Sequence, residues 1–188
     1  LQVGQRAHGR KAQVNVSVNT FIPKPHTPLQ WAPLAPQAIV EERQTLLRRQ
    51  LRGKGLKLSL SDPQETLIET VLARGDRRLS DVIETAWRSG ARFDAWGDQR
   101  DFGAWEQAFD AHPLDPGFYA YRQREPAEVF PWDVVDVGVE RSFLWREYQH
   151  SQRGETLVDC RERCHACGIL AAYDGRGSAG WRCPPVTQ

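Results

Sequence analysis

Four cysteines near the end of the chain are the residues best suited to bind a metal. Cys160, Cys164 and Cys167 follow one another as C-x3-C-x2-C in the segment DCRERCHACG, and Cys183 lies further on in a glycine-rich stretch. Three thiolates so close in sequence converge easily on one ion, and a fourth completes the all-cysteine set of many zinc and iron–sulfur sites. We therefore expect these cysteines to hold zinc or an iron–sulfur cluster, with His165 as an alternative ligand.

The same cysteines have two other interpretations. Free thiols are the normal state in a reducing compartment, and disulfides need an oxidising compartment that nothing else in the sequence indicates. The spacing does not choose between zinc and iron–sulfur, because both accept four thiolates.

A second candidate site lies near the start of the chain, where three valines alternate with three small polar residues in AQVNVSVNTF, residues 12–21. The polar residues are Asn15, Ser17 and Asn19. Alternation of this kind predicts a strand with one apolar and one polar face. A buried parallel strand would be nearly continuously apolar, so the polar face either meets water or lines a polar cavity. We expect it to contact a cofactor inside a barrel; the alternative is a solvated sheet face.

The segment FIPKPHTPLQWAPLAP, residues 21–36, contains five prolines and predicts an extended loop. Lys24, His26 and Thr27 lie in this loop, which is longer than most connections in compact domains. Long loops often carry function, so these three residues are candidates for a cofactor or substrate contact. The alternative is that the prolines only stiffen a surface connection.

The elements around these candidates indicate an α/β start and a helical continuation. A helical apolar stripe from Pro36 to Gly53 and a second alternating segment, LKLSL at 56–60, predict a βαβ unit with parallel strands. Further helices are expected at 62–75, 79–90, 102–109, from Asp115, and at 140–151, with 131–139 extended or loop. We expect Trp87, Trp105 and Phe109 to pack in the core of these helices. Ion pairs between two helices are expected from Arg74, Asp76, Arg77 and Arg78.

The charge balance argues against an electrostatic nucleic-acid binder, since 25 Lys and Arg face 24 Asp and Glu. A basic run at the end of one predicted helix comprises Arg43, Arg48, Arg49, Arg52, Lys54 and Lys57. Cations there complement the helix dipole, so a solvated face is the better interpretation and nucleic acid is a disfavoured partner that stays open.

No apolar run approaches 18 residues and the first residues show no signal-peptide pattern, so we expect a cytoplasmic protein without a membrane partner. The chain contains no methionine and begins at Leu1, so we expect it to be a fragment of a longer polypeptide.

Several long motifs carry a resemblance to a known family. FIPKPHTPLQW, RGDRRLSDVIETAW, GARFDAW, PWDVVDVGV and DCRERCHACG resemble the C-terminal part of an uncharacterised family of cobalamin-binding-domain radical S-adenosylmethionine proteins. The resemblance covers roughly residues 8 to 168. It implies an N-terminal cobalamin-type Rossmann domain, a partial βα barrel holding a [4Fe–4S] cluster and S-adenosylmethionine, and a helical extension.

On this resemblance, the fold class is α/β: the last βα unit of a truncated, partial TIM-type barrel, followed by a mostly helical extension and a Cys-rich tail. The expected domains are residues 1–60 for the barrel fragment, 61–152 for the helical extension and 153–188 for the tail. The polar face of the first strand would point into the barrel, and the proline-rich loop would emerge at the C-terminal edge, where barrel enzymes place their sites. The partners would be small-molecule cofactors and the upstream part of the same polypeptide.

The resemblance also bears on the cysteines. In radical enzymes of this class the catalytic C-x3-C-x2-C follows the first barrel strand, whereas only 21 residues follow Cys167 here. The tail cysteines are therefore expected to hold an auxiliary metal and not the catalytic cluster, and the fragment alone should be inactive. The alternative function is a non-catalytic zinc- or RNA-binding module with a four-cysteine knuckle.

Overall fold

The computed structural model describes residues 1–92, 94 and 101–173, and these residues form two compact units that are considered separately. The first unit comprises residues 1–22 and 34–122. The second unit comprises residues 23–33 and the chain from residue 123 onward. The domain boundaries expected after residues 60 and 152 stay a prediction.

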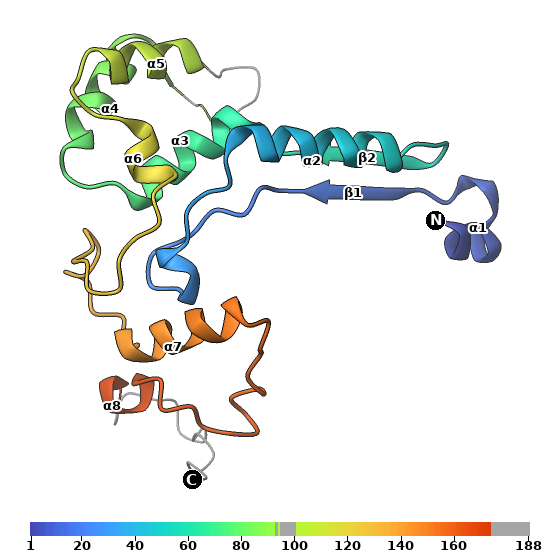
Figure 1. The fold of residues 1–188 in the computed structure, drawn as a ribbon. Helices are drawn as coiled ribbons and strands as arrows, with labels where there is room; N and C mark the ends of the chain where they lie inside the picture. Colours follow the sequence, from blue (N-terminus) through green and yellow to red (C-terminus); the bar gives the residue numbers. More distant parts are fainter. Residues whose placement is uncertain (93, 95–100, 174–188) are drawn as a thin grey trace. The chain divides into compact units, whose positions relative to one another are not determined.

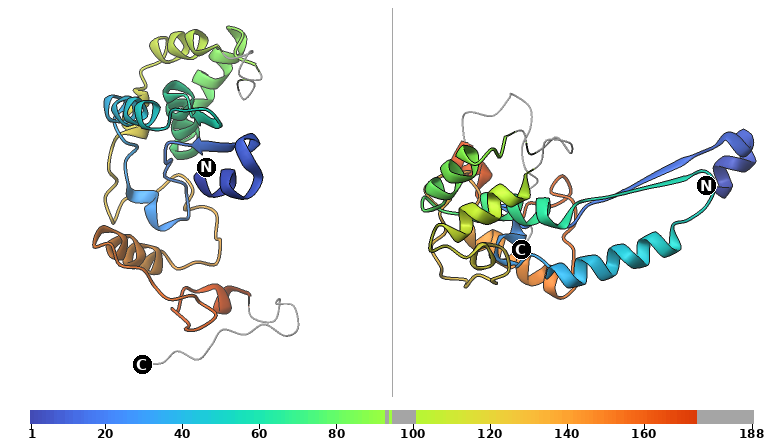
Figure 2. Two further views of the ribbon diagram at one scale, coloured as in Figure 1. Left: turned by 90° about the vertical axis from the view of Figure 1, so that its right-hand side faces the viewer. Right: turned by 90° about the horizontal axis from the view of Figure 1, so that it is seen from above.

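The first unit contains the βαβ arrangement that the sequence predicts (Figures 1 and 2). Strands β1 (Val14–Val18) and β2 (Leu56–Leu60) pair in parallel, and helix α2 (Gln37–Gln50) lies between them in sequence. The predicted parallel pairing is confirmed. The helix is shorter than expected: Pro36 is its N-cap and not its first residue, and Leu51 is its C-cap.

Four further helices complete the first unit, and the described part of its core lies among them. They are α3 (Pro63–Arg74), α4 (Leu79–Arg88), α5 (Phe102–Asp110) and α6 (Pro116–Ala120). Three aspartates begin these helices by accepting backbone N–H bonds: Asp62 for α3, Asp101 for α5 and Asp115 for α6. Proline at the first helical position of α3 and α6 strengthens the same start signal.

The core of the helical part agrees with the predicted apolar stripes except at one tryptophan. Trp105 and Phe109 are buried, and their ring centroids lie 6.5 Å apart. Trp87 was expected in the core, but 54% of it is exposed and the guanidinium of Arg92 lies 5.3 Å from its ring centroid. The prediction for Trp87 is wrong: the buried face of α4 consists of Leu79, Val82 and Ala86, and Trp87 lies outside it.

The N-terminal helix α1 (Gln2–His8) contains no buried residue and is followed by a short 3-10 turn, η1 (Gly9–Lys11). The sequence did not predict this helix, because QVGQRAH has no apolar stripe to place against a core.

The second unit is built on aromatic side chains. Its elements are the 3-10 turn η2 (Pro28–Trp31), helix α7 (Arg141–Gln152) and the short helix α8 (Ile169–Tyr173). Trp31 is fully buried among Phe130, Trp145 and Tyr148. The loop and the helix predicted at 131–139 and 140–151 are confirmed.

No helix among the described residues is both long enough and apolar enough to cross a membrane.

Candidate functional site

The polar side chains predicted on the first strand share one face with polar residues of β2. In the parallel register Asn15 lies opposite Lys57 and Ser17 lies opposite Ser59, and all four are exposed. Asn19, just beyond β1, is exposed as well. The sequence did not assign Lys57 and Ser59 to this site, although the alternation in LKLSL predicts their common face once the register is known.

The opposite face of the sheet is apolar and lies against α2. Val14, Val16 and Val18 pair with leucines of β2, and all of these side chains are half-buried. A hollow of about 370 Å³ between this face and the end of α2 is lined by Leu58, Leu60, Arg48 and Leu51. The helix therefore covers the apolar side, and the polar side is left open to solvent in the described part of the chain. The prediction that the polar side lines a barrel cavity stays a prediction.

The proline-rich loop that follows β1 is held in place by a buried glutamine. Gln30, which is only 3% exposed, accepts hydrogen bonds at Oε1 from the backbone N–H of His26 (3.2 Å) and from Nε1 of Trp132 (2.8 Å). His26 has a φ of 55°, in the left-handed region that non-glycine residues rarely adopt. The loop is thus fixed by specific contacts and not only by its prolines.

The three candidate residues of this loop lie close together in one turn. The hydroxyl of Thr27 donates to the backbone oxygen of Lys24 at 2.8 Å, while Lys24 is exposed and His26 half-buried. An ammonium group and an imidazole ring on a fixed turn can donate hydrogen bonds to an anionic group such as a carboxylate or phosphate.

The cysteine segment is attached to the second unit by its backbone. Glu140, the N-cap of α7, donates its N–H to the carbonyl of Cys167 at 2.8 Å. Gly168 has a φ of 101°, and a Cβ there would lie 3.0 Å from the carbonyl oxygen of Gly138, so this close approach requires glycine. The backbone of the tail segment therefore contacts the start of α7.

The side chains of the described cysteines are free thiols. Cys160 is exposed, and Cys164 and Cys167 are half-buried. Within residues 1–92, 94 and 101–173, no three His, Cys, Asp or Glu side chains are grouped to hold a metal. The fourth predicted ligand, Cys183, lies outside the described residues. His165 is engaged by its Nε2 with the carbonyl of Val158 at 3.0 Å, so the metal site stays a prediction.

Of the residues predicted to form ion pairs between two helices, Arg78 and Asp76 form a pair within the turn that joins α3 to α4. The Arg78 guanidinium binds the Asp76 carboxylate at 2.7 Å, and this hydrogen bond lowers the pKa of Asp76. Tyr119 donates its hydroxyl to the same carboxylate at 3.3 Å, and burial raises the pKa of Tyr119. Arg74 donates to the backbone carbonyls of Tyr119 and Arg122, and its predicted ion pair stays a prediction.

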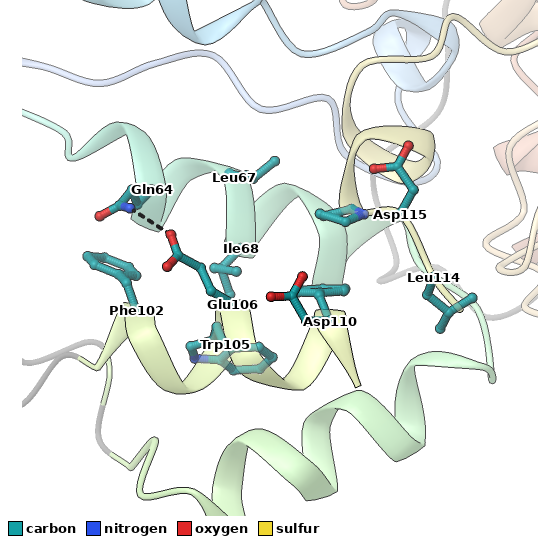
Figure 3. A pocket seen from close by; sticks show the side chains of 11 residues that line it. Gln64, Leu67, Ile68, Phe102, Trp105, Glu106, Asp110, Leu114 and Asp115 are labelled. Atoms are coloured by element: carbon teal, nitrogen blue, oxygen red, sulfur yellow. Dashed lines mark hydrogen bonds between the residues drawn. The ribbon is translucent and has the colours of Figure 1, made fainter. Parts of the chain in front are cut away.

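A pocket of about 480 Å³ that was not predicted from the sequence lies between α3 and α5 (Figure 3). Leu67 and Ile68 of α3 face Phe102, Trp105 and Phe109 of α5 across it. Trp105 and Phe109 were predicted as core residues, which is confirmed, and both also line the pocket. The pocket depends on how far apart α3 and α5 lie. The periodic apolar pattern of a helix sequence does not predict that distance.

Three comparisons, with protein families, with curated proteins and with solved structures, found no match to the chain.

Proposed function

We propose that the chain supplies the last βα unit and the helical extension of a radical S-adenosylmethionine enzyme of the cobalamin-binding type. One observation carries the proposal: a two-stranded parallel sheet has α2 on its apolar face and exposed polar side chains on the other. Parallel strands occur almost only in larger sheets with both faces covered, and an isolated pair of strands is marginally stable. The pair therefore suits a place in a larger barrel, with α2 outside and the polar face inside.

The role of this chain in such a barrel is to hold a polar cofactor. The amides of Asn15 and Asn19 and the hydroxyl of Ser17 can hydrogen-bond the amino, carboxylate or ribose groups of S-adenosylmethionine. Lys24 and His26, on the turn after the strand, would add cationic or imidazole donors for an anionic group.

The described residues do not fit the catalytic [4Fe–4S] cluster. The exposed strand face offers amides, hydroxyls and one ammonium group, none of which is a thiolate ligand for iron. The tail cysteines follow the βαβ unit, whereas the catalytic cysteines of this class precede it in the chain. This chain's contribution is cofactor positioning, and the radical-forming step belongs to other parts of the enzyme.

The proposal is tested on the full-length gene product, purified anaerobically, reduced and supplied with S-adenosylmethionine. Formation of 5′-deoxyadenosine is expected from the full-length protein and not from residues 1–188 alone. Asn15→Ala or Ser17→Ala should weaken S-adenosylmethionine binding about tenfold, because each removes a hydrogen bond to a charged or polar ligand group. Ser142→Ala, an exposed hydroxyl on α7, is the matched control and should leave the affinity unchanged.

Two outcomes would contradict the proposal. One is cleavage of S-adenosylmethionine by residues 1–188 alone. The other is a full-length protein that binds neither iron nor S-adenosylmethionine.

For the tail we propose an auxiliary zinc ion or iron–sulfur cluster on Cys160, Cys164, Cys167 and Cys183. Thiolates suit both metals, and the Glu140–Cys167 backbone bond ties the segment to a helix. The metal would be structural or would transfer electrons. Metal analysis and visible absorption of anaerobically purified protein distinguish the two: iron with a brown colour indicates a cluster, and zinc without colour indicates a knuckle. Protein without metal, or Cys164→Ser with full metal content, would contradict the site.

The competing function is a non-catalytic zinc- or RNA-binding module. Zinc at the tail, together with no S-adenosylmethionine cleavage by the full-length protein, would favour it. We propose a cytoplasmic location for the enzyme, since a reducing compartment keeps cysteines available as metal ligands.

A further inference from the structure

The pocket between α3 and α5 has the size and lining of a small-molecule site, and the function proposed above does not use it. Its volume of about 480 Å³ falls in the range of pockets that hold drug-sized ligands. All of its lining residues belong to the first unit, on α3, on α5 and on the segment that leads into α6. Its walls are mainly apolar and include the rings of Phe102, Trp105 and Phe109.

The charged residues that line the pocket are all acidic. They are Glu106, Asp110 and Asp115, and the described lining contains no lysine, arginine or histidine. Asp115 is already engaged, because its Oδ1 accepts the N–H of Gly117 at 2.7 Å and caps α6. Glu106 and Asp110 are therefore the carboxylates available to a ligand.

These two carboxylates have few partners of their own. Glu106 accepts one long hydrogen bond of 3.4 Å from Nε2 of Gln64, which leaves it further acceptor capacity. Asp110 takes part in no side-chain hydrogen bond or ion pair within the described part of the chain. Figure 3 shows both side chains projecting from α5 toward α3, into the space of the pocket.

The arrangement favours a positively charged occupant. Glu106 and Asp110 are four residues apart on α5, so their like charges repel each other and a cation between them relieves that repulsion. Nε1 of Trp105 already donates to Asp94 at 2.8 Å, so a ligand meets the ring of Trp105 and not its N–H group.

We propose that this pocket binds a small organic cation with a planar, apolar body. The cationic group, an ammonium or amidinium, is held between Glu106 and Asp110 by charge-assisted hydrogen bonds. The body packs against Phe102, Trp105 and the α3 residues Leu67 and Ile68. The pocket rejects anions, because the carboxylates at its wall repel them.

Three probes of nearly equal shape and different charge test the charge preference: benzamidine, benzamide and benzoate. Each is titrated into the full chain labelled with nitrogen-15, and the indole N–H resonance of Trp105 is followed by NMR. Benzamidine should shift this resonance and saturate, benzamide should bind about tenfold more weakly, and benzoate should not bind. Equal binding of benzamidine and benzamide would overturn the proposal, as would preferred binding of benzoate.

Substitutions locate the site. Glu106→Gln and Asp110→Asn keep the side-chain shape and remove the charge, so each should weaken benzamidine binding about tenfold. Glu42→Gln, at an exposed carboxylate of α2 outside the pocket, removes the same charge and should change the affinity less than twofold. Leu67→Trp fills the pocket and should abolish binding of every probe. Circular dichroism confirms that each variant is folded, and unchanged affinity in a folded Asp110→Asn would overturn the assignment.

A protein partner that inserts an arginine side chain is the competing occupant. A short arginine-containing peptide is therefore titrated beside benzamidine. Tighter binding of the peptide, by tenfold or more, would assign the pocket to a protein partner and overturn the small-molecule proposal.

Discussion

Arg74 illustrates how a charged side chain can be buried for a structural reason. It is 1% exposed, and its guanidinium donates to the carbonyls of Tyr119 at 3.0 Å and Arg122 at 3.2 Å. Tyr119 lies in the last turn of α6, whose end carries carbonyls without helical partners and favours a cation. The arginine thus links the end of α3 to the end of α6.

Arg74→Met should lower the free energy of unfolding by about 3 kcal/mol, because it leaves buried carbonyls without donors while keeping most of the side-chain volume. Urea unfolding followed by circular dichroism measures the change. Arg77→Met, at an exposed arginine in the same turn, is the control and should stay within about 0.5 kcal/mol of wild type. A loss for Arg74→Met no larger than that of the control would contradict this role.

The Asp76–Arg78 ion pair should make the free energy of unfolding depend on pH in the acid range. The hydrogen bond from Arg78 holds the pKa of Asp76 below its ordinary value of 3.8 in the folded protein. The stability from this pair is therefore complete above about pH 4 and is lost as the pH falls through the lowered pKa. Asp76→Asn should remove that part of the acid sensitivity, measured as the difference in unfolding midpoint between pH 6 and pH 3. An unchanged difference would show that other carboxylates dominate.

The sequence predicted the burial of a side chain correctly where the apolar stripe of its helix could pack in only one way. The burial of Trp105 and Phe109 follows from the stripe of α5, since α5 is short and has one apolar side. Trp87 sits on an equally good stripe in α4 and is exposed. Periodicity tells which side of a helix is apolar, but the neighbouring helices decide how much of that side they cover.

At the level of elements, the start signals of helices were the most reliable guide. Asp62 with Pro63 and Asp115 with Pro116 begin α3 and α6 where the sequence predicts, because the aspartate caps backbone N–H groups that the helix leaves free. The helix ends were less well predicted: α2 stops at Gln50, three residues before the expected glycine. Helix ends depend on packing, and packing is not visible in a local pattern.

Two glycines on these elements should respond oppositely to substitution by alanine. A Cβ at Gly75 would lie 2.7 Å from the carbonyl oxygen of Val71 and would also meet the side chain of Leu79. Gly75→Ala should therefore destabilise the protein by about 1–3 kcal/mol. At Gly103, in the first turn of α5, a Cβ would meet only Asp101 at 3.4 Å.

Gly103→Ala should leave stability unchanged or raise it by about 0.5 kcal/mol, because it lowers the entropy of the unfolded chain. Thermal unfolding of both variants, compared with wild type, measures the contrast. A midpoint for Gly75→Ala at or above that of Gly103→Ala would contradict the close packing between α3 and α4.

For the whole molecule, the sequence predicted the local βαβ unit but not the division into two units. The second unit joins residues 23–33 to residues more than a hundred positions later, as in the hydrogen bond between Gln30 and Trp132. Such contacts have no local signature in the sequence. The same limit applies to the candidate sites: the chain order predicted the strand face and the loop, while the pocket between α3 and α5 depends on how helices pack.

The Gln30–Trp132 contact predicts a long-range effect on the candidate loop. Gln30→Leu removes the acceptor for Trp132 Nε1 and for the N–H of His26, and it should cost about 1–3 kcal/mol. Faster amide hydrogen exchange is expected at His26, with exchange in α4 unchanged. Gln37→Leu, at an exposed glutamine at the start of α2, is the control. Equal protection of His26 in both variants would contradict the anchoring of the loop by Gln30.

The discontinuous second unit has a consequence for the order of events during synthesis. Residues 23–33 leave the ribosome long before the helix that carries Trp145 and Tyr148, the ring partners of Trp31. Trp31 must therefore lack its ring partners from α7 while the whole first unit is made, although Gln30 can already bond Trp132. A nascent chain that stops before α7 would carry the turn of Lys24 and His26 with the ring of Trp31 incompletely packed.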